Sequence, residues 1–444
     1  MTLGPRVLRL ALLAAGFALC AAPAAWAAWP NNPIANVPLC AATSDQVNPA
    51  AVADGAGGAI VAWHDYRNGN ADIYARRVDA AGVPQWTANG VALCTATGDQ
   101  KLPLIVSDGA GGAVIVWEDL RSGNWDIYAQ RVDAAGAVQW TANGVALSTA
   151  TGDQNDFAVV SDGAGGAIVA WADLRSGTNY DIYAQRVTAA GVAQWVADGR
   201  PVCTAIGNQF APALAPGGAG GAIVTWFDWR SGTDADIYAQ RLLGSAAIWW
   251  AVDGVAICNS IYSQEDPVIV ADGTGGAVIA WEDSRSGSEY DLYAQRVNAL
   301  GAAQWASNGV AFCSATGHED NLAIVSDGAA GAIIAWEDPR SGSDDIYAQR
   351  VTAAGAVQWG ASGLALCSAT RDQGFHSMTS DGVGGAIVAW YDMRIDPLSS
   401  DAHAQRVNGA GAVQWTADGV ALSTAAGYQL APTVVSDGAG GAIV

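Results

Sequence analysis

The residues best suited to chemistry are acids and one histidine that stand outside the regular pattern of the chain. Glu265 and Asp266 are adjacent, and His318, Glu319 and Asp320 form a second group. Two carboxylates that flank a glycosidic bond can cleave it by acid–base chemistry. One histidine beside two acids also offers metal ligands, but it lacks the spacing of a known metal motif. Whether these groups converge depends on the elements that carry them.

Those elements belong to a repeat of about 54 residues, a period typical of propellers and related arrays. Its unit reads SDGAGGAIVAWxDxRSGxxDIYAQRVxAAGxVQWxAxGVALCxATGxQ. A glycine-rich turn marks each copy, at Asp54, Asp108, Asp162, Gly217, Asp272, Asp327, Asp381 and Asp437.

The second copy illustrates the four strands that we expect in each unit. They are Pro103–Ser107, Ala113–Trp117, Asp126–Val132 and Gly144–Ser148, separated by turn residues. Residues 113–117 are apolar without alternation, which indicates a strand covered on both faces. A sheet packed between sister sheets is typical of a propeller blade. We therefore predict an all-β chain, a β-propeller of four-stranded antiparallel blades, with a linear β-solenoid as the alternative.

The number of blades follows from the complete copies and the flanking pieces. Seven copies carry the second-strand tryptophan, an orphan fourth strand is expected at Asn36–Ala42, and an eighth first strand at Pro432–Ser436 precedes the end at Val444. We predict an eight-bladed ring over residues 28–444, with the last blade truncated and completed by the orphan strand. The alternative is a seven-bladed ring with two overhanging strands.

Aspartate and arginine recur in two series that hold most of the basic residues. The first follows the second strand, at Asp65/Arg67, Asp119/Arg121, Asp173/Arg175, Asp228/Arg230, Asp283/Arg285, Asp338/Arg340 and Asp392/Arg394. The second lies in the third strand, at Asp72/Arg77, Asp126/Arg131, Asp181/Arg186, Asp236/Arg241, Asp291/Arg296, Asp345/Arg350 and Asp401/Arg406. Groups present in every copy are scaffold, so we expect bidentate Asp–Arg pairs that fix loops or join blades.

A further series of tryptophans also recurs in every copy and is predicted to pack between blades, at Trp86, Trp140, Trp195, Trp250, Trp305, Trp359 and Trp415.

Six cysteines share one position of the repeat, at Cys40, Cys94, Cys203, Cys258, Cys313 and Cys367. A whole unit separates neighbouring sulfurs, which is too far for a disulfide. We expect buried free thiols and no zinc cluster.

The Ser-Asp-Gly turns invite a calcium interpretation. Calcium takes six or more oxygens, whereas each turn offers one carboxylate, so we expect ordinary hairpins and no cofactor. The turns are loosely similar to the Asp-box of sialidase-like propellers, although Trp117 follows Ser107 too late and no residue separates Ser107 from Asp108.

The whole unit resembles repeats of exported, mostly uncharacterised bacterial β-propeller proteins. The resemblance extends from Trp29 to Val444, and Asp-Ile-Tyr-Ala-Gln-Arg at residues 126–131 is its most specific string. It implies a propeller fold and an exported location, and it supplies no substrate.

The N-terminus and the charge are consistent with export. Residues 1–27 have the basic start, apolar middle and small-residue end of a signal peptide, and an uncleaved membrane anchor is the alternative. The formal net charge of −22 repels nucleic acid and anionic membranes. We expect a monomeric protein at the bacterial cell surface or outside the cell, with the periplasm as the alternative.

Copies differ most in the connection from the fourth strand to the next first strand, and at the end of the connection between second and third strands. In an up-and-down blade both connections emerge on one end of the ring, which we call the variable face; the other end is the constant face. Loops on a rigid frame commonly carry binding. Candidate binding residues on the variable face are Trp125, Tyr180, Tyr290, Phe210, Glu265, Asp266, His318, Glu319 and Asp320.

These residues support a non-catalytic module that binds protein or glycan. The alternatives are a propeller-type glycoside hydrolase or lyase, which needs a close pair of carboxylates on this face, and a structural spacer.

Overall fold

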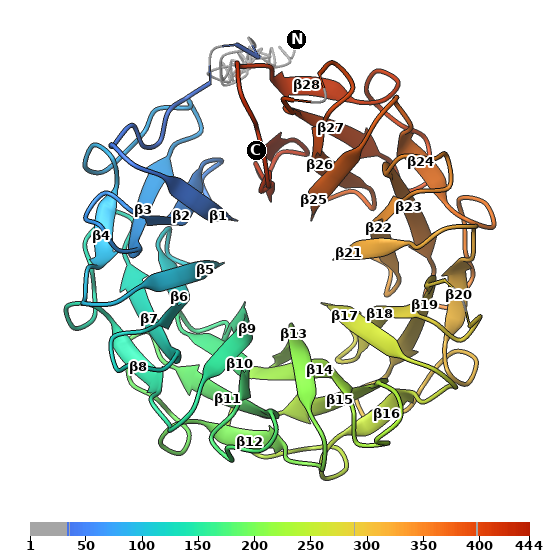
Figure 1. Ribbon diagram of the computed structural model, residues 1–444, viewed down its shortest axis with the longest axis horizontal. Helices are drawn as coiled ribbons and strands as arrows, with labels where there is room; N and C mark the ends of the chain where they lie inside the picture. The colour runs from blue at the N-terminus through green and yellow to red at the C-terminus, as the bar shows by residue number, and fades with distance from the viewer. Residues whose placement is uncertain (1–32, 35, 288, 397) are drawn as a thin grey trace, which may run out of the picture.

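The chain forms a closed ring of β-sheets around a central channel, as Figure 1 shows for a computed structural model that describes residues 33–34, 36–287, 289–396 and 398–444. The described residues form thirty strands and no helix. Within these ranges no helix is long and apolar enough to cross a membrane. The predicted signal segment, residues 1–27, lies outside the described residues.

Seven sheets have four antiparallel strands each, in chain order from the channel outward. The first strands line the channel: β1 (Gln46–Ala53), β5 (Gln100–Ser107), β9 (Gln154–Ser161), β13 (Gln209–Gly218), β17 (Gln264–Ala271), β21 (Asp320–Ser326) and β25 (Gln373–Ser380). The second strands follow: β2 (Ala59–Asp65), β6 (Ala113–Asp119), β10 (Ala167–Asp173), β14 (Gly221–Asp228), β18 (Ala277–Asp283), β22 (Ala332–Asp338) and β26 (Ala386–Asp392).

The outer half of each blade consists of a long third strand and a short fourth strand. The third strands are β3 (Asp72–Val78), β7 (Asp126–Val132), β11 (Asp181–Val187), β15 (Asp236–Leu242), β19 (Asp291–Val297), β23 (Asp345–Val351) and β27 (Asp401–Val407). The fourth strands are β4 (Val91–Cys94), β8 (Val145–Ser148), β12 (Arg200–Cys203), β16 (Val255–Cys258), β20 (Val310–Cys313), β24 (Leu364–Cys367) and β28 (Val420–Ser423).

The prediction of a four-stranded propeller is confirmed, but the ring holds seven such blades, as in the alternative, and not eight. The eighth repeat contributes only a two-stranded sheet, β29 (Val435–Ser436) with β30 (Ala442–Ile443). Val435 and Ile443 pack against Ala59 and Val78 of the first blade. This sheet therefore occupies the space between the seventh and first blades.

The predicted orphan strand Asn36–Ala42 is not a strand. A fourth strand pairs with the third strand of its own sheet, and β29–β30 has no third strand among the described residues. The segment is held by side chains instead: Asn36 Nδ2 donates to Ser423 Oγ at 2.6 Å, and the Ala41 amide donates to Asn89 Oδ1 at 2.9 Å.

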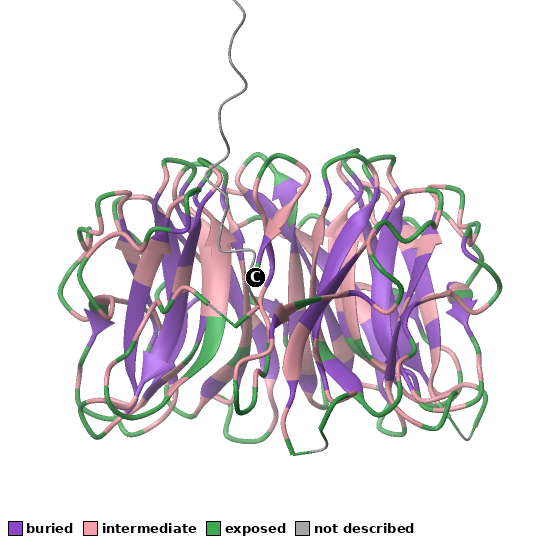
Figure 2. Cartoon of the chain, turned by 90° about the horizontal axis from the view of Figure 1, so that it is seen from above, coloured by how far each residue is buried: buried purple, intermediate pink, exposed green. Residues whose placement is uncertain are grey.

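The core lies between blades, because each sheet covers the apolar face of its neighbour (Figure 2). Every residue of β6 is buried, as its unbroken apolar run predicts. Ile60 and Ile73 of the first blade pack with Ile115 and Trp117 of the second. Among the described residues the six repeat cysteines are free, and all but Cys40 are buried.

The first Asp–Arg series is scaffold, as predicted. In the second blade Arg121 binds Asp119 through two hydrogen bonds, of 2.8 and 2.5 Å. Trp117 Nε1 donates to the same carboxylate at 2.8 Å, and Arg121 lies over the Tyr128 ring at 3.9 Å. The Trp, Asp and Arg thus fix each other, and they hold the connection between the second and third strands in place.

The second Asp–Arg series was predicted with the wrong partner. Arg131 binds Asp108 of the glycine-rich turn at 2.8 Å rather than Asp126 of its own strand. Asp108 also accepts the amides of Ala110 and Gly112, each at 2.8 Å. Where Gly217 replaces the turn aspartate, Arg241 donates to the Gly217 carbonyl instead.

The second tryptophan series joins neighbouring blades, which confirms the prediction. Trp140 Nε1 donates to the Ala189 carbonyl of the next blade at 3.0 Å, and Arg131 Nη1 donates to the same carbonyl at 3.1 Å. The ring lies against Gly191, where an added Cβ would approach the indole to 2.7 Å. This contact requires glycine at that turn.

We expect Gly144→Ala to destabilise the ring strongly. Gly144 has a φ of +85°, and an added Cβ would lie 2.6 Å from the Trp117 ring. The left-handed conformation costs about 1–2 kcal/mol for alanine, and overpacking adds about 1–3 kcal/mol. Gly109→Ala is the matched control, since Gly109 has a φ of +72° with nothing within 4 Å of the added Cβ. Urea denaturation should show the larger loss for Gly144→Ala; equal losses would contradict the packing argument.

Candidate functional site

The strand pairing sets both variable connections on one end of the ring. Gln264 pairs with Asp283 across the first two strands, and Asp283 pairs with Asp291 across the next two. These three residues therefore lie at the same end of the blade. The connection that leads to Gln264 and the connection from Asp283 to Asp291 both lie on the variable face. The sequence of the turns on the constant face is constant for a structural reason. These turns carry the backbone carbonyls that accept hydrogen bonds from the previous blade, as Ala189 does from Trp140 and Arg131.

Every first strand contains a bulge near the variable face. The residue at the bulge has a positive φ in all seven blades, at Asn48, Leu102, Asp156, Ala211, Asp266, Asn321 and Phe375, and so does Ala431 at the equivalent position of the eighth repeat. Bulges of this kind redirect side chains next to functional sites. For leucine and phenylalanine the conformation is strained, so the flanking strands must hold it.

Three carboxylates of the second strands lie directly below these bulges and bind them from the preceding blade. The Asp156 amide donates to Glu118 at 3.1 Å, the Asn321 amide to Glu282 at 3.1 Å, and the Phe375 amide to Glu337 at 2.6 Å. Asp156 repeats the arrangement one blade further, since it accepts the Ala211 amide at 2.6 Å. Acidic side chains therefore join blades at the mouth of the channel.

The acids gather most densely where the fifth and sixth blades meet. Glu265 pairs directly with Glu282 across two strands, and Asp320 pairs with Glu337 in the same way. Burial raises the pKa of Glu282 to about 8, and the charges of Asp266 and Asp320 add to the shift. Reduced access to water, followed by the charge of Glu337, likewise raises the pKa of Asp320.

Asp266 belongs to the same acidic group, although its side chain reaches solvent. The protein around it lowers its access to water, and the charges of Glu265 and Asp156 add to this, so that its pKa is raised. We call Glu265, Asp266, Glu282 and Asp320 the acidic cluster. In the described chain, no lysine or arginine forms an ion pair with any of its four members.

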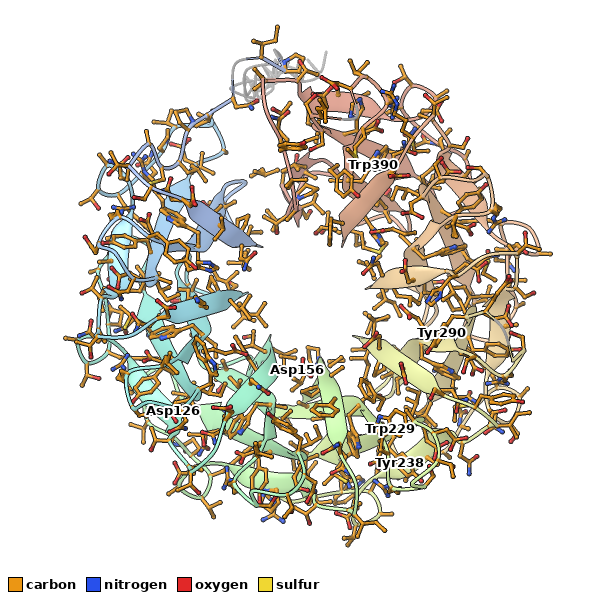
Figure 3. All side chains as sticks on the ribbon, viewed as in Figure 1. Asp126, Asp156, Trp229, Tyr238, Tyr290 and Trp390 are labelled. Atoms are coloured by element: carbon orange, nitrogen blue, oxygen red, sulfur yellow. The ribbon has the colours of Figure 1, made fainter. Side chains whose placement is uncertain are left out.

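Aromatic residues border the acidic cluster. The rings of Tyr290 and His318 lie 4.5 Å apart across the boundary of the fifth and sixth blades, and Tyr290 Oη lies 3.3 Å from Glu265 Oε2. On the other side, Phe210 contacts Tyr180 at 4.9 Å and Phe227 at 5.9 Å. Figure 3 shows Asp156 near the inner edge of the ring and Tyr290 further from the axis.

Two predicted site residues lie elsewhere. Trp125 is in the second blade, 5.8 Å from Lys101 Nζ, and Lys101 forms an ion pair of 2.7 Å with Asp99. Glu319 is on a variable connection but is fully buried beneath it. The other seven predicted residues lie on the variable face of the third to sixth blades.

The sequence analysis missed the residue that follows the second-strand tryptophan. Three blades have glutamate at this position, and the other four each have a different residue. In blade order the residues are His64, Glu118, Ala172, Phe227, Glu282, Glu337 and Tyr391. Its variation is visible in the sequence, but none of its residues was assigned to the site, because the strand around it is otherwise constant. The position belongs to the variable face.

Comparison with known proteins gives similarity of fold alone. The sequence matches no known family and no curated protein. An ulvan lyase, a polysaccharide lyase, is 12% identical with a TM-score of 0.49, covering 85% of this chain and 97% of its own. An α-L-arabinofuranosidase from Fusarium graminearum, in complex with arabinobiose, is 13% identical with a TM-score of 0.39, covering 69% and 93%. A protein of unknown function from Dyadobacter fermentans is 11% identical with a TM-score of 0.40, covering 80% and 93%.

We expect the acidic cluster to cost stability as the pH rises. The pKa of Glu282 is about 8 in the folded chain and about 4.3 in an unfolded one. Between these values the folded state holds a proton that the unfolded state has released, so stability falls as the pH increases. Glu282→Gln removes this titration, and its amide oxygen can still accept the Asn321 amide.

Thermal unfolding between pH 5 and 8.5 measures the effect. The melting temperature of the wild type should fall further than that of Glu282→Gln, and Asp133→Asn, in a turn on the constant face, should follow the wild type. Parallel curves for the wild type and Glu282→Gln would contradict the assignment.

Proposed function

We propose that the protein is an exported binding module that takes a carbohydrate on the variable face, over the third to sixth blades. The observation that carries the proposal is the grouping of unlike residues that break the repeat: the acidic cluster adjoins the Tyr290–His318 pair at the fifth and sixth blades, and the Tyr180–Phe210–Phe227 group lies on the third and fourth blades.

The chemistry of these groups suits a sugar. Aromatic rings stack on the apolar faces of pyranose rings, and carboxylates accept hydrogen bonds from hydroxyl groups at roughly twice the strength of neutral acceptors. The bulge residue Phe375 is 61% exposed and lies 5.5 Å from Tyr391, which extends the aromatic border into the seventh blade.

The negative charge of the acidic cluster should distinguish anionic glycans from neutral and cationic ones. The acidic cluster has no lysine or arginine partner in the described chain, so a uronic acid or a sulfated sugar would meet unbalanced negative charge. We therefore propose neutral or amino sugars as the ligand class. A basic protein segment is the other partner that such a face accepts.

A glycan array followed by calorimetry tests the proposal. We expect binding of neutral or amino-sugar glycans, no binding of uronic or sulfated ones, and a loss of at least about tenfold in affinity for Phe210→Ala and Tyr290→Ala. Trp249→Ala is the matched control, because Trp249 is 54% exposed near the constant face. Equal effects of all three substitutions, or no glycan bound at all, would contradict the proposal.

One observation favours hydrolysis or elimination as a second candidate. The raised pKa of Glu282 keeps that carboxyl protonated near neutral pH, beside Asp266 and Asp320. A protonated acid beside a carboxylate is the pair that glycosidases use. Reducing-end assays on bound glycans test it: turnover that is lost in Glu282→Gln while binding persists would establish an enzyme, and absence of turnover leaves a binding module.

A further inference from the structure

One blade boundary carries a buried acid where all the others carry an amide. Each first strand is preceded or begun by glutamine, at Gln46, Gln100, Gln154, Gln209, Gln264, Gln373 and Gln429, whereas the sixth blade has Glu319. Glu319 is 0% exposed, and neither of its carboxylate oxygens has a hydrogen-bond partner.

The glutamines at this position are donors. Gln209 Nε2 donates to the Ala205 carbonyl at 3.3 Å and to the Gly207 carbonyl at 3.1 Å, and Gln154 Nε2 donates to the corresponding carbonyls of its own loop. Ala315 and Gly317 hold the equivalent carbonyls above Glu319. A carboxylate cannot donate to them, so this position lacks the hydrogen-bond donor that the amide supplies elsewhere.

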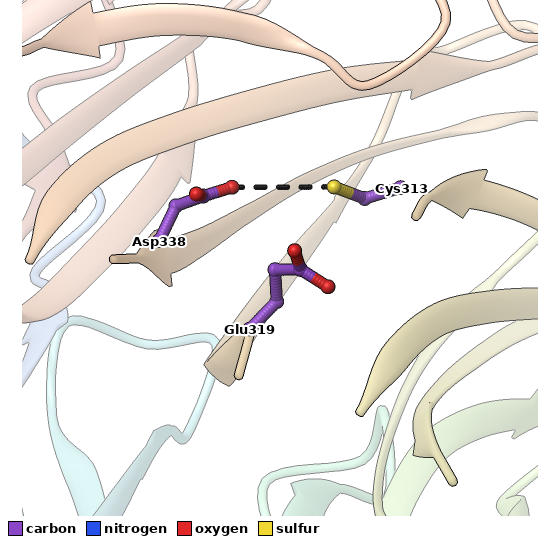
Figure 4. Close-up of side chains that lie close together, drawn as sticks. All are labelled: Cys313, Glu319 and Asp338. Atoms are coloured by element: carbon purple, nitrogen blue, oxygen red, sulfur yellow. Dashed lines mark hydrogen bonds between the residues drawn. The ribbon is translucent and has the colours of Figure 1, made fainter. Parts of the chain in front are cut away.

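Glu319 also faces two further ligand atoms. One ligand atom each of Cys313, Glu319 and Asp338 lies within 4.8 Å of the others, and all three residues are buried. Cys313 Sγ is 4.0 Å from Asp338 Oδ2, as Figure 4 shows, with the Glu319 carboxylate turned toward both. In tetrahedral zinc sites the bond lengths set sulfur and oxygen about 3.5 Å apart, so a shift of about half an ångström brings these two atoms to that separation.

We propose that Cys313, Glu319 and Asp338 bind one divalent cation of the zinc class between the fifth and sixth blades. The ligand types fit, since thiolate and carboxylate are both zinc ligands. The fourth position falls to a loop carbonyl or to water. This site is separate from the proposed glycan surface, although its loop carries His318 and Asp320 to that surface.

The charges balance with and without the ion. Asp338 is paired with Arg340, whose Nη2 also lies 3.3 Å from Cys313 Sγ. The remaining groups are Glu319 and Cys313, which are neutral when each holds a proton. A dication replaces those two protons, so that the metal–carboxylate–thiolate group is neutral as well.

The loop above the site separates it from solvent and connects it to the Tyr290–His318 pair. Thr316 and His318 are exposed, so only one layer of loop separates Glu319 from solvent. The Gly317 amide donates to Glu289 at 3.0 Å, and the His318 ring contacts the Tyr290 ring in a tilted arrangement. An ion bound beneath this loop would hold the Tyr290–His318 pair in place.

Zinc titration of the full chain, stripped with chelator, tests the proposal. We expect one Zn²⁺ per chain, a higher melting temperature in excess zinc, and loss of both in Glu319→Gln, which restores the residue of the other repeats and should fold normally. Cobalt loading should give a thiolate charge-transfer absorption that Cys313→Ser removes.

The reverse substitution is the matched control. Gln264→Glu places the same carboxylate beside Cys258 and Asp283, which lie 3.9 Å apart, and should add a second Zn²⁺. The proposal is overturned if the wild type binds no zinc, or if Glu319→Gln binds as much as the wild type. A wild type that binds none while Glu319→Gln is more stable would show that Glu319 holds only a proton.

Discussion

The structure depends on one buried aspartate at the end of each second strand. In the second blade Asp119 is fully buried and accepts hydrogen bonds from Trp117 and Arg121, and the arginine is in turn held over Tyr128. A buried charge that loses one partner destabilises a protein by about 3–5 kcal/mol. Each blade contains its own copy of this network, which fixes its second and third strands to each other, and Arg121 extends the network to Cys94 of the preceding blade.

One set of contacts between blades lies near the constant face. There the carbonyl of Ala189 accepts both Trp140 and Arg131 from the preceding blade, and Gly191 leaves room for the indole ring. A substitution in these turns would disturb two blades at once. The variable face has contacts between blades as well, through carboxylates that accept bulge amides of the next blade, but these contacts are present at some boundaries and not in every copy. The function of this face must be argued from the chemistry of its residues, since their variability alone has a structural explanation.

The sequence predicted what is encoded in every copy. The period, the unalternated run in β6 and the glycine-rich turns together defined the strands, their order and their burial. The partner of Arg131 was not predictable, because Asp126 is five residues away along the chain and Asp108 is 23 residues away, and only the pairing of strands brings the more distant carboxylate to the arginine. The strand expected at Asn36–Ala42 failed for a related reason: a repeat position forms a strand only where its hydrogen-bonding partner is present.

The candidate site likewise contains residues that the sequence identified and residues that only the structure places there. Sequence comparison among the copies identified Glu265, Asp266 and Asp320 because they differ from their equivalents. It did not identify Glu282, which lies next to a constant tryptophan. Nor did it separate Glu319 from its neighbours, because burial cannot be read from one exceptional residue in a loop. Folding places Glu282 with the acids of the face and Glu319 beneath them.

The acidic cluster itself argues for an external partner. Clusters of carboxylates in proteins are commonly balanced by arginine or lysine, and this chain uses its arginines in the repeated scaffold pairs. Its single lysine is bound to Asp99 in another part of the ring. Within the described chain the Asn321 amide and the Tyr290 hydroxyl donate to Glu282 and Glu265, and the remaining repulsion is relieved by holding protons, as the raised pKa of Glu282 indicates. A ligand that donates hydrogen bonds or brings positive charge would relieve the same repulsion, and an anionic one would increase it. The electrostatics of the empty face thus favour hydroxyl-rich or cationic ligands, independently of any similarity of fold.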